Sequence, residues 1–343
     1  MIKKYRWLIA VMIIYYAVFF GSGRLVRVGG SSSYLLSAAG AVICFLLYGL
    51  IYHPRAFAAF KSGEIGGTVR MIIGAAVLIS ALVQAVAVCT WSVKSVSQVF
   101  MKKSPFPYIL FFMMLPSLVG AYFDIKSVAR YAFLCGVSIV SAVGLIFIFG
   151  AEGYSAKNLY PLMGRGFDSF KNLLTAAAVY ANVFYIFILG AGAERSEMRK
   201  ETGKILLISG LFFAAVCLMC NLSAPYEVLG LLDDPLLYVA SAVDFSFLVE
   251  RSEALVFLIR IFLSFLCLSA LMCFVCNSAV HAFSLSDRKA VIGAAGIIIA
   301  SGALLADKYC LAEPLIVFSL IWTFAASVLV PVILRIAYAL AER

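Results

Sequence analysis

The sequence predicts an all-α polytopic membrane protein of about ten transmembrane helices, folded as a single domain over residues 1–343. The chain is 64% hydrophobic and only 13% charged, whereas a soluble domain carries about 25% charged residues. Its mean hydropathy is +1.05, and apolar runs recur from end to end with polar residues gathered between them. Lipid cannot hydrogen-bond backbone groups, so these runs are expected to be helices; the short alternating segments of a membrane β-barrel are not visible.

Ten apolar runs approach the ~20 residues that a helix needs to cross a hydrocarbon core about 30 Å thick. They are Trp7–Gly29, Tyr34–Tyr52, Arg70–Phe100, Phe106–Phe123, Val128–Gly150, Leu173–Gly192, Ile205–Cys220, Glu253–Val280, Ala290–Ala306 and Pro314–Ala339. Two connections, Ala151–Asn172 and Asn221–Ser252, are too long to be simple turns. Because long ordered loops often act as lids, we expect both to close the extracellular face.

The basic residues predict the orientation. The net charge is +10, but no basic run is long enough to indicate nucleic-acid binding. Most Lys and Arg residues fall at span ends on the same side as Lys3 and Lys4, whereas acidic residues gather in the Asn221–Ser252 connection. The positive-inside rule then places both termini in the cytoplasm. The basic N-terminus resembles that of a signal peptide, but no small-residue cleavage site follows, so we expect the first apolar run to remain a span.

The cysteines and other reactive side chains do not indicate a metal site or an enzyme. Two Cys-x-x-Cys pairs, Cys217/Cys220 and Cys273/Cys276, have the spacing of zinc ligands. Both pairs lie in apolar helices, where thiolates are strongly disfavoured. No nucleophile–base set or phosphate-binding loop is visible. We therefore expect no metal, no cofactor and no catalytic residue.

The first apolar run is interrupted by Gly21, Ser22 and Gly23. The run Trp7–Phe20 gives about 21 Å of helix, which ends inside the bilayer. Two glycines around a serine disfavour a continuous helix, and unpaired backbone groups in a membrane are tolerated where they line a polar cavity. Transporters bind substrates at such half-helix ends. The alternative is a glycine pair that only allows close helix packing.

A counterpart interruption is expected five spans later if the fold is an inverted repeat. The sixth run contains Tyr180, Ala181 and Asn182 near its middle. Asn182 could hydrogen-bond a ligand or an unwound carbonyl, and it is equally suited to bonding a neighbouring helix.

The third and eighth runs carry unusual polar residues. Gln84, Trp91, Lys94 and Gln98 follow one helical stripe, which suits a helix that lines an aqueous site. Lys94 is expected to reach the outer interface. Arg260 lies two turns into the eighth run and is a functional candidate, because ionisable residues inside a membrane are rarely incidental. Its structural alternative is an ion pair with Asp244 or Glu250.

Four stretches occur in the order of a known family's motifs. They are Ser104-Pro-Phe-Pro107, Gly120–Arg130, Asn158–Gly166 and Val243–Ala254. On these stretches the chain resembles the B subunit of the GerA-type spore germination receptors, in the amino acid–polyamine–organocation transporter superfamily. The residues that carry the likeness are Arg130, Asn158, Pro161, Gly164, Gly166, Asp244, Phe245, Glu250, Arg251 and Glu253. Two places depart from the family pattern: Ser32-Ser33-Tyr34 replaces an aromatic element, and the sixth run lacks an acidic residue near its middle.

The resemblance implies a LeuT-type fold of two inverted five-helix repeats, about 7–150 and 173–339, with the first and sixth helices broken around a central site. It also implies a role in sensing a nutrient, commonly an amino acid, in the inner membrane of a spore, together with an A subunit and a C-subunit lipoprotein. Gly21, Ser22 and Gly23 would face Tyr180, Ala181 and Asn182 across the pocket, with Gln84 and Trp91 beside them. A permease of the same superfamily and an assembly subunit with a decayed pocket remain the alternatives.

Overall fold

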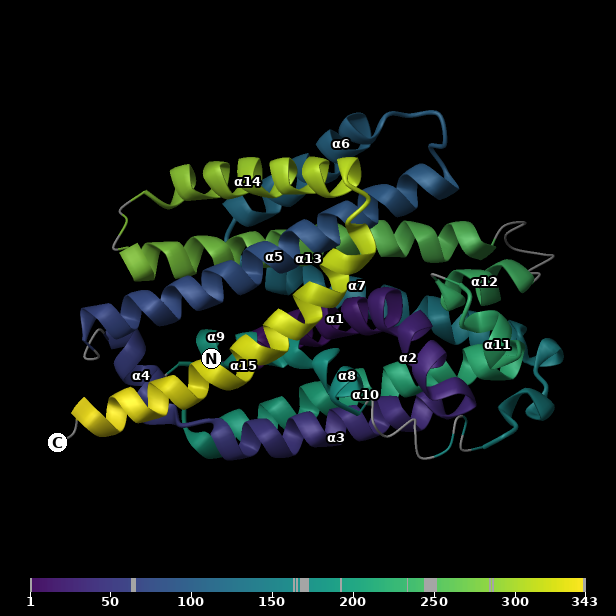
Figure 1. Ribbon diagram of the computed structural model, residues 1–343, viewed down its shortest axis with the longest axis horizontal. Helices are drawn as coiled ribbons and strands as arrows, with labels where there is room; N and C mark the ends of the chain where they lie inside the picture. The colour runs from purple at the N-terminus through teal and green to yellow at the C-terminus, as the bar shows by residue number, and fades with distance from the viewer. Residues whose placement is uncertain are drawn as a thin grey trace.

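The computed structural model describes residues 2–62, 66–162, 164, 166, 173–191, 193–232, 234–243, 252–283, 285 and 287–341. Every regular element within these ranges is a helix. Most of the helices run along the long axis of the molecule (Figure 1). The short helix α4 (Pro54–Ser62) and the C-terminus lie at one end, and α11 (Tyr226–Leu229) and α12 (Pro235–Ala242) lie at the other. We call these the α4 end and the α12 end.

Each of the expected apolar runs contains described helix. In chain order the main helices are α1 (Arg6–Tyr16), α2 (Ser22–Gly29), α3 (Ser33–Ile51), α5 (Gly67–Val99), α6 (Phe106–Tyr122), α7 (Ile125–Phe149), α8 (Leu173–Ala178), α9 (Tyr185–Leu189), α10 (Arg195–Ser223), α13 (Ser252–Phe283), α14 (Arg288–Lys308) and α15 (Ala312–Ala341).

Seven helical stretches in the described part of the chain are long and apolar enough to cross a membrane. One of them, Lys3–Ile51, contains the first two expected spans, because a 3-10 turn joins α2 to α3. The fourth expected span is a shorter helix of 17 residues, and the sixth is divided into short pieces. The protein is thus a multi-pass membrane protein, and the number of ten crossings stays a prediction.

The first span lies at the centre of the bundle. Every residue from Leu8 to Gly23 is buried, as expected for a helix that is apolar on all sides. Helices α5 and α13 pack along each other beside it (Figure 1). Peripheral helices turn large apolar side chains outward, among them Leu134, Ile148, Ile297 and Ile321. Such side chains suit contact with lipid.

At the α12 end, hydrogen bonds join the turn between α2 and α3 to α10 and to the loop that contains Pro161. Asn221, near the end of α10, donates from Nδ2 to the Ser31 carbonyl at 3.1 Å and to Ser33 Oγ at 2.9 Å. Ser31 Oγ in turn donates to the carbonyl of Pro161. Ser33, from the Ser32-Ser33-Tyr34 stretch that replaces the aromatic element of the family pattern, and its neighbour Ser31 therefore hold this turn in place by hydrogen bonds.

The family-like stretch Asn158–Gly166 closes the same end. Asn158 Nδ2 donates to the Leu222 carbonyl at 3.1 Å, at the end of α10. The Gly164 N–H donates to the Pro161 carbonyl at 2.8 Å. Gly164 and Gly166 have φ of +56° and +69°, a region that favours glycine. Asn158, Pro161, Gly164 and Gly166 thus stabilise the conformation of this loop.

The other residues that carry the family resemblance lie elsewhere. Arg130 is exposed near the start of α7, while Asp244, Phe245, Glu250 and Arg251 lie outside the described residues.

Candidate ligand site at the centre of the bundle

The first span is interrupted close to where the glycines predicted, but in a different form. Ala17–Gly21 form a π-helical turn that leads directly into α2, and the flanking residues keep right-handed helical angles. Ser22 Oγ donates to the Val18 carbonyl at 2.6 Å across this turn. The expectation of unwound backbone at Gly21–Gly23 is therefore corrected to one wide turn centred on the preceding residues. Single π turns of this kind are frequent at functional sites.

The sixth span is broken as predicted. Helix α8 ends at Ala178, a turn follows at Val179 and Tyr180, and a 3-10 turn over Ala181–Phe184 leads into α9. The two interruptions lie against each other: a Cβ on Gly21 would stand 3.2 Å from Val179 Cγ2. Gly21 thus serves close approach of the first and sixth spans.

Tyr180 does not face the first span. Its hydroxyl is hydrogen-bonded to Ser37 Oγ at 2.8 Å and donates to the Ser37 carbonyl at 3.1 Å. Ser37 belongs to α3, so the ring of Tyr180 fastens the sixth span to the second. Ala181 is buried in the 3-10 turn.

A cluster of buried polar side chains lies where the third, sixth and tenth spans meet the first. Gln84 Nε2 donates to Thr323 Oγ1, and Ser80 Oγ lies 3.4 Å from the same Thr323 oxygen. The Tyr16 hydroxyl, one residue before the π turn, donates to the Gln84 carbonyl at 3.3 Å. We call these residues, together with Asn182 and Tyr185, the central polar cluster.

Three atoms of this cluster are buried without a hydrogen-bond partner among the described residues: Gln84 Oε1, Asn182 Oδ1 and the Tyr185 hydroxyl. Asn182 lies in the 3-10 turn and Tyr185 follows it directly, three residues later, so the two side chains share about one face. That turn packs against α1 and α15. Buried polar groups are normally paired. Two amide oxygens and a hydroxyl are therefore left without the partner that buried polar groups normally have.

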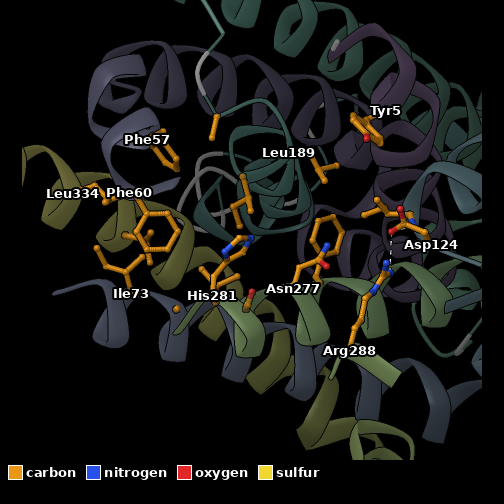
Figure 2. A pocket seen from close by; sticks show the side chains of 18 of the residues that line it. Tyr5, Phe57, Phe60, Ile73, Asp124, Leu189, Asn277, His281, Arg288 and Leu334 are labelled. Atoms are coloured by element: carbon orange, nitrogen blue, oxygen red, sulfur yellow. Dashed lines mark hydrogen bonds and ion pairs between the residues drawn. The ribbon is translucent and has the colours of Figure 1, made fainter. Parts of the chain in front are cut away.

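A cavity of about 420 Å³ leads toward this cluster from the α4 end. Figure 2 shows Asn277 and His281 of α13 between an aromatic wall on one side and the Asp124–Arg288 ion pair on the other. The two charged side chains of that pair are 2.8 Å apart. Phe274 also lines the cavity, and its ring stacks on Tyr185 with centroids 4.2 Å apart. Phe274 therefore lies between the cavity and Tyr185 of the central polar cluster.

A second cavity of about 350 Å³ lies at the α12 end. Trp91 and Gln98 of α5 line it, as does Glu253 at the start of α13. Lys94 is half-buried, and its Nζ lies 5.9 Å from the centre of the Trp91 ring. The predicted stripe is therefore divided: Trp91 and Gln98 face this cavity, and Gln84 lies deeper in the central polar cluster.

Arg260 forms its ion pair with Asp234, with Nη1 and Oδ2 2.5 Å apart. Asp234 belongs to the acid-rich connection Asn221–Ser252, as the structural alternative expected, whereas the acids named there, Asp244 and Glu250, lie outside the described residues.

Sequence reasoning missed several residues of the site. Tyr15 is hydrogen-bonded to Ser92 and Ser264 at 2.8 and 2.9 Å, and these serines are 3.0 Å apart. Tyr16, Ser80, Tyr185 and Thr323 were also not anticipated. The one available signal was the pair of tyrosines at 15 and 16, in the middle of an otherwise apolar first span.

The sequence model of one protein family matches residues 72–308 of the chain. This family is named Spore_permease and is described as 'Spore germination protein'. The chain belongs to this spore germination protein family. No curated protein sequence matches it.

Two solved structures show the fold of this spore germination protein. It is similar to a Na⁺-coupled sialic acid symporter in a substrate-bound outward-open state, with a TM-score of 0.62 and 12% identity over 96% of this chain and 89% of that one. It is also similar to Mhp1, a nucleobase-cation-symport-1 family transporter with bromovinylhydantoin bound, with a TM-score of 0.60 and 11% identity over 88% and 71% of the two chains. The LeuT-type fold that the resemblance implied is confirmed, and its division into two inverted repeats stays a prediction.

Proposed function

We propose that this spore germination protein is the nutrient-sensing subunit of a germinant receptor and binds an amino acid between its first, third, sixth and tenth spans. The observation that carries the proposal is the set of three unpartnered polar atoms in the central polar cluster, on Gln84, Asn182 and Tyr185. All three residues are buried, and two of them belong to the broken sixth span. Leaving such groups unpaired costs about 1–3 kcal/mol each, which a bound ligand would offset.

The proposed site differs from the sequence-based prediction in its members. Gln84, Ala181 and Asn182 remain, Tyr185 is added, and Tyr180 is left out because its hydroxyl is committed to Ser37. Gly21 shapes the site by letting the first span approach the sixth, and Ser22 is hydrogen-bonded to the Val18 carbonyl across the π turn. Gly23 is buried in α2. Amide oxygens accept hydrogen bonds, so they suit the ammonium group of an amino acid.

A receptor of this kind responds because its ligand binds one conformation better than another. Cavities lie toward both ends of the bundle, and Tyr185 of the cluster stacks on Phe274, which lines the α4-end cavity. A ligand that engages the Tyr185 hydroxyl would therefore bias the position of α9 and α13. The site of action is the inner membrane of the spore, with both termini cytoplasmic and with an A subunit and a C-subunit lipoprotein as partners.

A pair of tyrosine variants tests the site. Tyr185→Phe removes an unpartnered hydroxyl of the cluster, and Tyr180→Phe removes a hydroxyl that bonds α3, five residues away on the same span. Spores that carry each variant are exposed to a panel of the twenty amino acids, and subunit abundance is measured by immunoblot. Tyr185→Phe and Asn182→Leu are expected to raise the nutrient concentration for half-maximal germination at least tenfold, while Tyr180→Phe at equal abundance leaves it within about twofold. Equal responses of all three variants would overturn the placement of the site.

A permease is the second candidate, because the central polar cluster has a cavity toward each end and the fold is that of transporters. Uptake of radiolabelled amino acids into proteoliposomes separates the two. Saturable accumulation that Asn182→Leu abolishes would favour the permease, whereas binding without accumulation favours the receptor.

A further inference from the structure

Arg260 is a buried arginine, and only one of its three guanidinium nitrogens has a hydrogen-bond partner among the described residues. It lies in α13 and is 3% exposed. Its Nη1 is paired with Asp234 Oδ2 at 2.5 Å, and Asp234 Oδ1 accepts a hydrogen bond from the Leu237 N–H at 3.2 Å, which caps α12. The ion pair thus ties the short helix α12 to the eighth span.

The remaining edge of this guanidinium is free. Nε and Nη2 of Arg260 are buried and have no hydrogen-bond partner among the described residues. These two nitrogens form the side-on edge of an arginine, with parallel N–H bonds that match the two oxygens of a carboxylate. A buried cationic donor edge without acceptors is costly. Its geometry points to an anionic ligand.

Trp91 supplies a second donor in the same place. It is 8% exposed, and its indole Nε1 also has no partner within the described part of the chain. Arg260 and Trp91 both line the α12-end cavity. The π turn lies beneath them: the Arg260 Cζ is 4.9 Å from the Phe19 ring centre, and the Phe20 and Trp91 ring centres are 6.0 Å apart.

The same cavity also holds an acid that is not paired. Glu253 lines it and is half-buried, and it forms no ion pair with any residue that the structure describes. The donors of Arg260 and Trp91 and the carboxylate of Glu253 line one cavity, and this combination of charges complements a zwitterion. The volume of about 350 Å³ lies within the range of small-molecule sites.

We propose that the α12-end cavity is a second binding site of this protein, which takes an α-amino acid. The ligand carboxylate is held by the side-on edge of Arg260 and by Trp91 Nε1, and the ligand ammonium group faces Glu253. The ligand class rests on the proposed function, whereas the site itself is separate from the central polar cluster. The donors are covered in this conformation, so the ligand reaches them when α12 shifts on its Asp234 anchor.

The fluorescence of Trp91 can report ligand binding in the α12-end cavity. The chain has three tryptophans, so the variant Trp7→Phe/Trp322→Phe leaves Trp91 as the only indole. The purified full chain is titrated with each of the twenty amino acids, and every amino acid that changes the fluorescence is compared with its C-terminal amide. We expect saturable changes with at least one amino acid and at least tenfold weaker binding of its amide, because the amide cannot accept two charge-assisted hydrogen bonds. Arg260→Lys, which keeps the charge but not the two-pronged edge, is expected to weaken binding of the amino acid tenfold and to leave that of the amide unchanged.

Asn182→Leu in the same background separates the two sites. The Trp91 response is expected to persist in this variant with its Kd changed by less than threefold. Absence of any fluorescence response, or equal affinity for the amino acid and its amide, would overturn the second site. If Asn182→Leu spores then still lose their nutrient response, the proposed function stands without the second site. If Asn182→Leu spores germinate normally, the proposed function has failed as well.

Discussion

The carbonyl oxygen of Gly29 occupies the space in which a side chain on Gly164 would begin: a Cβ built on Gly164 would lie 2.0 Å from that oxygen. Gly164 also has φ of +56°. The family-like loop and the turn that ends the first span therefore touch backbone to backbone at the α12 end. Only glycine satisfies both the close approach and the backbone angle.

Gly164→Ala is expected to destabilise the protein strongly, and Gly166 offers a matched control. Gly166 has φ of +69° but nothing within 4 Å of its Cβ position. Gly166→Ala should therefore cost only the backbone strain, about 1–2 kcal/mol, and Gly164→Ala at least about twice that. Thermal unfolding in detergent, followed by loss of the monodisperse peak, measures the difference. Equal melting temperatures for the two variants would show that the loop does not press on the Gly29 turn.

Substitution of the two tyrosines of the sixth span, Tyr180 and Tyr185, by phenylalanine is expected to have different effects on stability. Tyr180→Phe removes hydrogen bonds to Ser37 and is expected to lower the free energy of unfolding by about 1 kcal/mol. Tyr185→Phe removes a buried hydroxyl with no partner among the described residues, so it should be neutral or slightly stabilising without ligand. Denaturation of both variants in the absence of nutrients checks this. A loss at Tyr185 as large as at Tyr180 would reveal a structural partner for its hydroxyl.

The sequence predicted the fold well because the bilayer imposes it. Span positions follow from hydropathy, and the first-span interruption follows from two glycines around a serine. The form of that interruption could not be predicted from the sequence. Glycine indicates that a helix is weak at that place, but tertiary contacts, such as those of Val179 and Phe213 with Gly21, determine whether the chain unwinds or widens into a π turn.

The site was only partly predictable for a related reason. Gln84 and Asn182 stand out because amides are rare in apolar runs. Thr323 and Tyr185 do not, because hydroxyl-bearing residues are common in membrane helices, where they often bond their own backbone as Thr323 does to Ser319. The Arg260–Asp234 pair joins a helix to a loop segment 26 residues earlier, and no local pattern selects that acid over its neighbours.

Helix α3 contains a second matched pair of glycines. A Cβ on Gly40 would lie 2.7 Å from the backbone carbonyl of Ala176, whereas nothing lies within 4 Å of that position on Gly49. Gly40→Ala should force α3 away from α8 and destabilise the broken sixth span by about 1–3 kcal/mol. Gly49→Ala should stabilise the helix by up to about 1 kcal/mol. Opposite shifts in melting temperature are therefore expected, and a rise with Gly40→Ala would contradict the close contact of these helices.

Cys310 tests the orientation of the whole chain. It is the only exposed cysteine, since the other eight are buried. It lies in the turn between α14 and α15, close to Glu313, which pairs with Arg27 at the α12 end. If both termini are cytoplasmic, Cys310 faces the outside. A membrane-impermeant maleimide should label the protein in intact cells, and Cys310→Ser should abolish the labelling. Labelling confined to inverted vesicles would reverse the orientation and place the α4-end cavity, with His281 and the Asp124–Arg288 pair, on the outer face.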